Sequence, residues 1–148
     1  MTEGDGVDAQ ALQDKLEIHE LLAHYARGVD DRDWALYRSV FTSDAFIDYS
    51  SAGAAAGPRD EVAAALEAGF VTIPWSQHYI TNVEIDLDGD EATVRAMFFN
   101  PMQLPGMDEP SYCGGFYHHE LVRTAEGWKS RRLVEDNRWF LNRPSRPD

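Results

Sequence analysis

Three residues in this sequence have side chains that could together move a proton. Tyr25 and Asp30 belong to the segment 24–34, whereas His78 lies much farther along the chain. A neutral histidine suits proton abstraction near neutral pH, because its unperturbed pKa is about 6.5. A carboxylate paired with the ring fixes its tautomer and stabilises the imidazolium ion, and a tyrosine hydroxyl can donate to developing negative charge. These residue types indicate acid/base chemistry.

Spacing alone leaves a simpler interpretation of the same residues open. Asp30 can mark the end of a helix, and His78 can be an ordinary strand histidine with hydrogen-bonded ring nitrogens. The residue pattern by itself does not choose between this interpretation and a base paired with a carboxylate.

Other chemical motifs give weaker signals. His118 and His119 are adjacent on a predicted strand and point to opposite faces, so they cannot both bind one metal ion, although either could enter a pocket. The single cysteine, Cys113, is typical of a small core residue. The sequence has neither a Gly-rich phosphate loop nor a Gly-x-Ser-x-Gly motif, which disfavours nucleotide cofactors and serine hydrolysis. We expect no metal and no cofactor.

Three helices are predicted in the first half of the chain. The first covers residues 8–29, because apolar side chains recur there at spacings of three and four. Asp31 or Asp33 can cap a second helix over 34–41. The third helix covers 58–70, since Pro58 suits a first helical turn. Two helices therefore meet near Asp30.

The second half of the chain predicts strands. A short strand at 45–49 ends at Tyr49, and a loop follows at 50–57. Strands at 77–87 and 92–102 flank a turn, and strands at 112–124 and 128–139 flank another, so we expect two hairpins. The phase of the apolar residues changes within 77–87, which predicts a bulge. Residues 103–111 form a loop long enough to act as a rim or lid.

Length and charge limit the class of protein. The 148 residues are 43% hydrophobic, which is enough for one domain over 1–148, with an ordered core at 8–140 and tails at 1–7 and 141–148. The formal net charge of −13 argues against a nucleic-acid partner. The chain lacks a signal-peptide pattern and an apolar run of the roughly 20 residues that a membrane span needs. We expect a soluble cytoplasmic protein.

The order of elements predicts an α+β fold in which three N-terminal helices pack on a curved, mostly antiparallel sheet. Such a cone-shaped α+β barrel encloses a concavity that suits a small hydrophobic molecule. The large side chains that we expect to bind it are Trp34, Trp75, Phe98, Met102, Phe116 and Trp139.

Four segments carry a resemblance to a known family. They are 28–34 (GVDDRDW), 47–49 (IDY), 77–83 (QHYITNV) and 114–122 (GGFYHHELV). With the order of elements, they make residues 12–139 resemble the SnoaL-like group of the nuclear transport factor 2-like superfamily. The patterns are similar to those of scytalone dehydratase, hexachlorocyclohexane dehydrochlorinase and bile-acid dehydratase. These are cofactor-free lyases in which a histidine paired with an aspartate removes a proton from a hydrophobic cyclic substrate.

The resemblance implies roles for individual residues. Asp30 and His78 match the aspartate and histidine of those enzymes, so the resemblance favours their pairing. Tyr25 matches a helix tyrosine of the bile-acid enzyme, and Tyr49 matches a substrate-polarising tyrosine of the scytalone enzyme. Met102 stands where the scytalone enzyme has a second histidine.

The chain also lacks a second acid found in the bile-acid enzyme, which has an aspartate near the position of Asn100. The protonation of a leaving hydroxyl is therefore unassigned, and His118 or a tyrosine could supply it. The resemblance implies a cofactor-independent lyase or isomerase for a small cyclic or polycyclic metabolite. The alternative is a binding or polyketide-cyclase-type protein with the same pocket. Relatives of this kind form dimers or trimers, so we expect a homo-oligomer.

Overall fold

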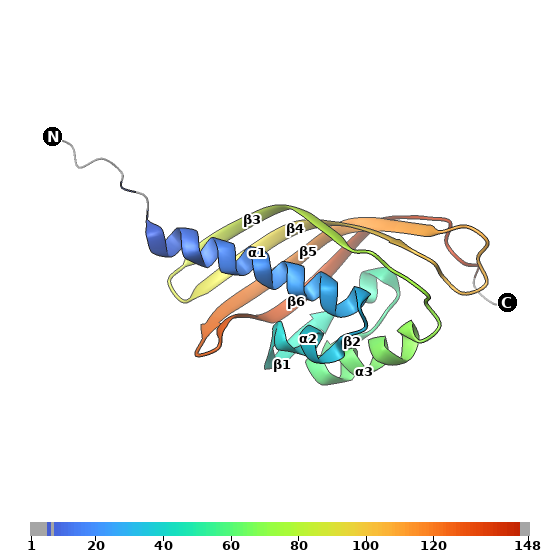
Figure 1. Ribbon diagram of the computed structural model, residues 1–148, viewed down its shortest axis with the longest axis horizontal. Helices are drawn as coiled ribbons and strands as arrows, with labels where there is room; N and C mark the ends of the chain where they lie inside the picture. The colour runs from blue at the N-terminus through green and yellow to red at the C-terminus, as the bar shows by residue number, and fades with distance from the viewer. Residues whose placement is uncertain (1–5, 7, 146–148) are drawn as a thin grey trace.

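The computed structural model describes residue 6 and residues 8–145, and it contains the elements that the sequence predicts in nearly the predicted places (Figure 1). The predicted tail positions 1–5, 7 and 146–148 lie outside the described residues. The helices are α1 (Ala9–Asp30), α2 (Trp34–Ser39) and α3 (Arg59–Phe70), with a 3₁₀ turn η1 (Ser50–Ala52). The strands are β1 (Phe41–Asp48), β2 (Ala56–Pro58), β3 (Tyr79–Asp88), β4 (Glu91–Met102), β5 (Ser111–Thr124) and β6 (Gly127–Leu141).

The strands form one six-stranded sheet in the order β2-β1-β6-β5-β4-β3. Among the described residues, β1 and β6 pair in parallel, and all other neighbouring strands are antiparallel. In Figure 1, α1 crosses the curved sheet, while α2 and α3 lie together near β1 and β2. Three helices on an open, mostly antiparallel sheet confirm the predicted α+β cone.

The helix boundaries follow from capping. The carboxylate of Asp8 accepts hydrogen bonds from the backbone N–H groups of Gln10 and Ala11 at the start of α1. The carboxylate of Asp33 accepts a bond from the N–H of Leu36 at 3.0 Å, so Asp33 caps α2. Of the two acids predicted as possible caps, Asp33 has this role, whereas Asp31 forms a surface ion pair with Arg27.

Gly28 allows α2 to lie close to α1. A Cβ atom at this position would lie 2.8 Å from the backbone nitrogen of Tyr37 and 2.9 Å from its Cα, closer than packed atoms approach. The absence of a side chain therefore brings Tyr37 against α1. This contact places the Tyr37 ring in the core beside Tyr25, at a centroid distance of 5.8 Å.

Two predicted boundaries differ from the structure. Phe41 was expected to end a helix, but it begins β1, because it pairs with Ser130 of β6. The predicted loop 50–57 contains η1 and the start of β2, which pairs with the end of β1. The bulge predicted in the first long strand is confirmed. The register of β3 on β4 shifts between Thr81 and Glu84, and Asn82 there has a φ of 50°.

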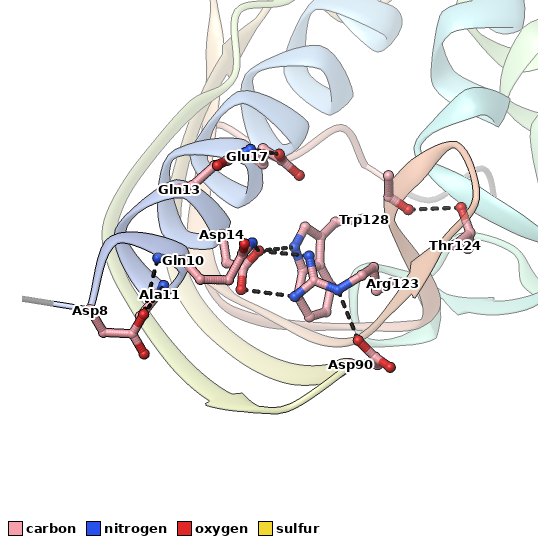
Figure 2. Close-up of polar contacts among 11 residues, drawn as sticks. Asp8, Gln10, Ala11, Gln13, Asp14, Glu17, Asp90, Arg123, Thr124 and Trp128 are labelled. Atoms are coloured by element: carbon pink, nitrogen blue, oxygen red, sulfur yellow. Dashed lines mark hydrogen bonds and ion pairs between the residues drawn. The ribbon is translucent and has the colours of Figure 1, made fainter.

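A buried ion pair fixes the N-terminal half of α1 to the sheet (Figure 2). The carboxylate of Asp14 accepts two hydrogen bonds from the guanidinium group of Arg123, at 2.8 and 2.9 Å, and one from the indole N–H of Trp128 at 3.1 Å. Arg123 also reaches Asp90, in the turn between β3 and β4, at 2.9 Å. One cluster therefore links α1 with both hairpins.

The sheet leaves large apolar side chains exposed on its outer face. Tyr79, Phe99 and Trp139 are each 40–45% exposed, and Phe99 stacks on Trp139 at a centroid distance of 6.0 Å. No helix among the described residues has the length and hydropathy needed to cross a membrane.

Candidate functional site

Asp30 and His78 meet where α1 ends and β3 is about to begin. The carboxylate Oδ1 of Asp30 lies 2.7 Å from Nδ1 of the His78 ring, and its Oδ2 accepts a 2.7 Å hydrogen bond from the backbone N–H of His78. The carboxylate therefore fixes both the backbone and the ring of the histidine. The two side chains are largely buried, with exposures of 6% for His78 and 17% for Asp30.

The charge of Asp30 determines which nitrogen of His78 can accept a proton. Burial raises the pKa of the Asp30 carboxyl, but the hydrogen bonds and charge of His78 outweigh this effect, and the pKa lies below its ordinary value. An ionised carboxylate only accepts hydrogen bonds, so Nδ1 must carry the hydrogen in the 2.7 Å contact. Nε2 of the neutral ring is then free to accept a proton.

Two residues that sequence reasoning did not assign hold Asp30 in place. Ser76 donates its hydroxyl to Oδ1 of Asp30 at 2.9 Å, and the guanidinium group of Arg32 donates to the Ser76 hydroxyl at 2.9 Å. Arg32 also donates to the carbonyls of Val29 and Ile73, both at 2.8 Å. The guanidinium group thus joins the end of α1 to the segment before β3. Arg32 itself has a left-handed backbone conformation, with a φ of 57°, in the turn between α1 and α2.

Tyrosine hydroxyls form a chain beside the histidine. The Tyr49 hydroxyl lies 2.7 Å from that of Tyr25 and 2.8 Å from that of Tyr37, and all three residues are buried. Burial raises the pKa of each hydroxyl, so the group stays neutral at ordinary pH. The Tyr25 hydroxyl also interacts with the hydroxyl of Tyr117, another residue of the cavity wall. The Tyr25 ring lies edge-on to His78, with centroids 6.5 Å apart.

These groups border a cavity of about 450 Å³ between the helices and the inner face of the sheet. Tyr25, Tyr49 and His78 lie in its wall, together with Met102 and Tyr117. Apolar lining comes from α1, α3, the segment after α3, β6 and the loop after β4, through Val29, Leu66, Phe70, Ile73, Leu104 and Phe140. This volume suits a small, largely apolar molecule. Arg143 and Pro144 also border the cavity, although the predicted tail begins at residue 141.

A second group of polar side chains lies in the same cavity wall. Glu135 of β6 is 9% exposed, and the neighbouring polar residues are Asn100 of β4 and Asn137 of β6. Burial raises the pKa of the Glu135 carboxyl to about 7. Burial and the negative charge of Glu135 raise the pKa of the Cys113 thiol to about 11, so this cysteine is no activated nucleophile.

The structure places several predicted site residues elsewhere. His118 and Phe116 lie on the outer face of β5, where Arg95 covers the Phe116 ring, and His118 does not reach the cavity. Trp139 is also outside, against Gly114. Trp75 is 41% exposed and does not line the cavity. The bulges in the β5–β6 pairing decide which side chains face inward, and the sequence pattern did not reveal them.

The other predicted pocket residues are buried, but only one reaches the cavity. Met102 is the one that lines it. Trp34 packs against Phe70 in the core, and Phe98 stacks on Tyr117 at a centroid distance of 4.4 Å. These two residues support the wall from behind.

His119 is the inward histidine of the adjacent pair. Its Nδ1 lies 2.9 Å from the Ser130 hydroxyl, and its ring is buried beside Tyr25. Burial, with the nearby charge of His118, lowers the pKa of His119 to about 3. The ring is therefore neutral and belongs to the core rather than to the cavity wall. Among the described residues, no group of three or more His, Cys, Asp or Glu side chains could hold a metal ion.

Comparisons with known proteins agree with the fold. A SnoaL-like domain model matches residues 10–134. An uncharacterized protein of Mycobacterium tuberculosis is 35% identical over 125 residues, which cover 84% of this chain and 85% of the relative.

Two solved structures share the architecture at low sequence identity. A candidate scytalone dehydratase from Novosphingobium aromaticivorans has a TM-score of 0.82 at 20% identity, over 92% of this chain and 91% of that chain. The hexachlorocyclohexane dehydrochlorinase LinA-type3 from Novosphingobium barchaimii has a TM-score of 0.78 at 19% identity, over 93% of this chain and 97% of that chain. At these identities the two structures show only that the fold is shared. The domain model matches most of the sequence, and this match shows the family. The chain belongs to the SnoaL-like domain family.

Proposed function

We propose that the chain is a cofactor-independent lyase or isomerase that removes a proton from carbon in a small hydrophobic cyclic or polycyclic metabolite. The observation that carries this proposal is the 2.7 Å contact between Asp30 and Nδ1 of His78 in the wall of an apolar cavity. In this arrangement Nε2 of His78 is the base. Asp30 orients the ring and stabilises the imidazolium ion that forms.

Tyr25 and Tyr49 supply the second requirement of proton abstraction. Negative charge develops on the substrate as the proton leaves, and a donor must stabilise it. Both hydroxyls border the cavity within one hydrogen-bonded chain, so they can donate to an oxygen conjugated with the forming carbanion. A positioned base contributes about 10²–10⁴-fold in rate, and such a donor adds to this factor.

Two further observations support elimination or isomerisation. The lining of the cavity is mostly apolar, which favours a hydrophobic ligand. A dehydrochlorinase and a candidate dehydratase share the fold, and both names describe eliminations.

Exchange with deuterated solvent tests the base directly. We expect the wild-type protein to incorporate deuterium next to the carbonyl of a bicyclic ketone such as decalone, and we expect His78→Ala and Asp30→Asn to lose this exchange. Unchanged exchange in both variants would overturn the assignment. Binding of the ketone without exchange in the wild type would instead favour the alternative, a ligand-binding or polyketide-cyclase-type protein with the same pocket.

A further inference from the structure

Three buried polar atoms in the cavity wall have no hydrogen-bond partner among the described residues. They are Oδ1 of Asn100, Oε1 of Glu135 and Nδ2 of Asn137. A buried polar group without a partner costs about 1–3 kcal/mol, so native structures rarely leave several together. Their presence in one wall indicates that a ligand supplies the missing partners.

The strand register brings these side chains together. Asn100 of β4 lies opposite Cys113 of β5, while Glu135 and Asn137 of β6 lie opposite Tyr117 and Gly115 of β5. The hydroxyl of Ser51 fixes this part of β6, because it donates to the carbonyl of Glu135 at 2.7 Å and accepts from the N–H of Asn137 at 2.9 Å. The group is therefore held by three strands and by η1.

The chemistry of the group suits an uncharged oxygen. A side-chain amide offers donors and an acceptor, and a protonated carboxyl offers a donor. Burial favours the protonated form of Glu135, with a pKa of about 7. A hydrogen bond with Tyr117 lowers the pKa of Glu135, and the negative charge of Asp48 at the end of β1 raises it. The cationic side chain of Arg143 also borders the cavity.

We propose that Glu135, Asn100 and Asn137 form a subsite that binds a hydroxyl or carbonyl oxygen of the substrate, and that Glu135 protonates a hydroxyl as it leaves. This inference rests on the proposed function, because the leaving step follows proton abstraction by His78. It assigns the group that protonates the leaving hydroxyl, a role that the sequence leaves open because Met102 and Asn100 stand where the related enzymes have an acid. Glu135 lies on a different strand from both of these positions.

The step balances without a cofactor. Nε2 of His78 takes the proton from carbon, and the electron pair of that C–H bond forms the new carbon–carbon double bond. The carbon–oxygen bond breaks, and the oxygen takes the proton of Glu135 and departs as water. Glu135 is left as a carboxylate and His78 as an imidazolium ion. Both return to their starting states by exchanging one proton each with solvent.

Two substrates that differ only in the leaving group test the role of Glu135. We would use β-hydroxydecalone, whose hydroxyl needs a proton to leave, and β-acetoxydecalone, whose acetate does not. Both give the same conjugated enone, so one absorbance assay follows them. We expect Glu135→Gln to slow loss of water by about 10²–10⁴-fold and to change loss of acetate by less than about 5-fold.

The matched control is Glu120→Gln, because Glu120 is an exposed acid on the outer face of the neighbouring strand β5. It should leave both reactions unchanged. Thermal unfolding of each variant shows whether the fold is intact. The role of Glu135 would be overturned if a folded Glu135→Gln variant eliminated water and acetate with equally reduced rates. It would also be overturned if neither rate were reduced.

Solvent exchange separates this failure from failure of the proposed function. If Glu135→Gln exchanges deuterium into decalone at the wild-type rate while water loss is also unchanged, the base stands and the acid is wrong. If the wild-type protein shows no exchange, the proposed function fails, and decalone binding then decides whether the subsite exists. Binding that weakens in wild type as pH rises through about 7, but not in Glu135→Gln, supports the subsite; matching pH profiles or no binding overturn it.

Discussion

The carboxylate of Asp30 holds His78 at two points, with Oδ1 2.7 Å from the ring Nδ1 and Oδ2 2.7 Å from the backbone nitrogen. A single carboxylate thus sets both the position of the strand residue and the tautomer of its ring. The two residues come from opposite ends of a segment that includes α2, β1 and α3. The site therefore forms only when α1 packs against β3.

Replacement of Asp30 by Asn should remove most of the proton-abstraction activity. The amide can still accept one hydrogen bond, but it cannot stabilise the imidazolium ion, so the rate of deuterium exchange should fall by about 10²–10⁴-fold. Asp31→Asn is the matched control, because Asp31 pairs only with Arg27 at the surface. A similar loss of exchange in the Asp31 variant would mean that the activity depends on the structure of the helix end rather than on the carboxylate of Asp30.

Ser76 is a positioning residue, so Ser76→Ala should lower the exchange rate less than Asp30→Asn does. Its hydroxyl links Asp30 to Arg32, so its loss frees the carboxylate and should reduce the exchange rate roughly 10-fold. Because Ser76 acts through Asp30 and does not line the cavity, its loss should lower the maximal exchange rate and leave the half-saturating concentration of decalone nearly unchanged. Ser39→Ala, at the exposed end of α2, serves as the control. A weaker affinity for decalone with an unchanged maximal rate would contradict the positioning role of Ser76.

Glu135 should make stability depend on pH above the usual carboxyl range. Its pKa is about 7 in the folded chain and near 4.5 in an ordinary environment, so the folded state holds a proton that the unfolded state releases. The stability of the wild type should therefore fall as pH rises from about 4.5 to about 7, by at most roughly 3 kcal/mol. Glu135→Gln should lack this decline.

Urea unfolding at several pH values measures the effect. The free energy of unfolding of the wild type minus that of Glu135→Gln should be smaller at pH 8 than at pH 5, because only the wild type loses stability as pH rises. Glu120→Gln should follow the wild type throughout. Parallel wild-type and Glu135→Gln curves would show that Glu135 does not titrate differently in the two states.

The sequence predicted the elements better than it predicted which strand residues face the cavity. Helical spacing identified the buried stripe of α1, and the turn signals identified both hairpins. The pairing of Asp30 with His78 came from the family resemblance, because no local pattern connects residues so far apart in the chain. The inward-facing positions of β5 and β6 could not be counted from the sequence, since bulges shift the register between Gly114 and Gly115 and again between Glu120 and Leu121.

The sequence around Glu135 carries a signal of its buried environment. It lies two positions after Leu133, which is fully buried, and alternation along a strand places both on the same face. An acid in phase with a buried leucine is a signal of an unusual environment. Arg32 and Ser76 gave no comparable signal, because their roles depend on loop geometry around two segments that meet only in the folded chain.

Self-association remains a prediction, and the outer face of the sheet is the surface we propose for it. Tyr79, Phe99 and Trp139 form an exposed apolar patch that no other part of the described chain covers, and a second copy of the chain can bury it. Phe99→Lys should then shift the protein to monomers in analytical ultracentrifugation. Val71→Lys is the control, because Val71 is apolar and 81% exposed but lies in the turn after α3 rather than on a strand of the sheet. A wild-type protein that sediments as a monomer over a wide concentration range would refute the prediction.

The cluster around Asp14 should stabilise the fold without affecting chemistry. Hydrogen bonds from Arg123 lower the pKa of the Asp14 carboxyl far below its ordinary value, so the cluster contributes stability above about pH 4 and loses it as pH falls further. This dependence is opposite in sign to that of Glu135. Asp14→Asn breaks the two-point contact with Arg123 and should lower the thermal unfolding midpoint at pH 7 by roughly 5 °C.

The matched variant is Asp90→Asn, which removes the other carboxylate on the same guanidinium group. Asp90 is 80% exposed, so its loss should change the midpoint by less than about 2 °C. Because Asp14 lies beside Trp128, away from the cavity wall, deuterium exchange in folded Asp14→Asn should match the wild type. The difference between the Asp14 variant and the wild type should also shrink below pH 4, where the wild-type carboxylate begins to lose its advantage. Equal effects of the two substitutions would show that surface charge, not the buried contact with α1, accounts for the stability.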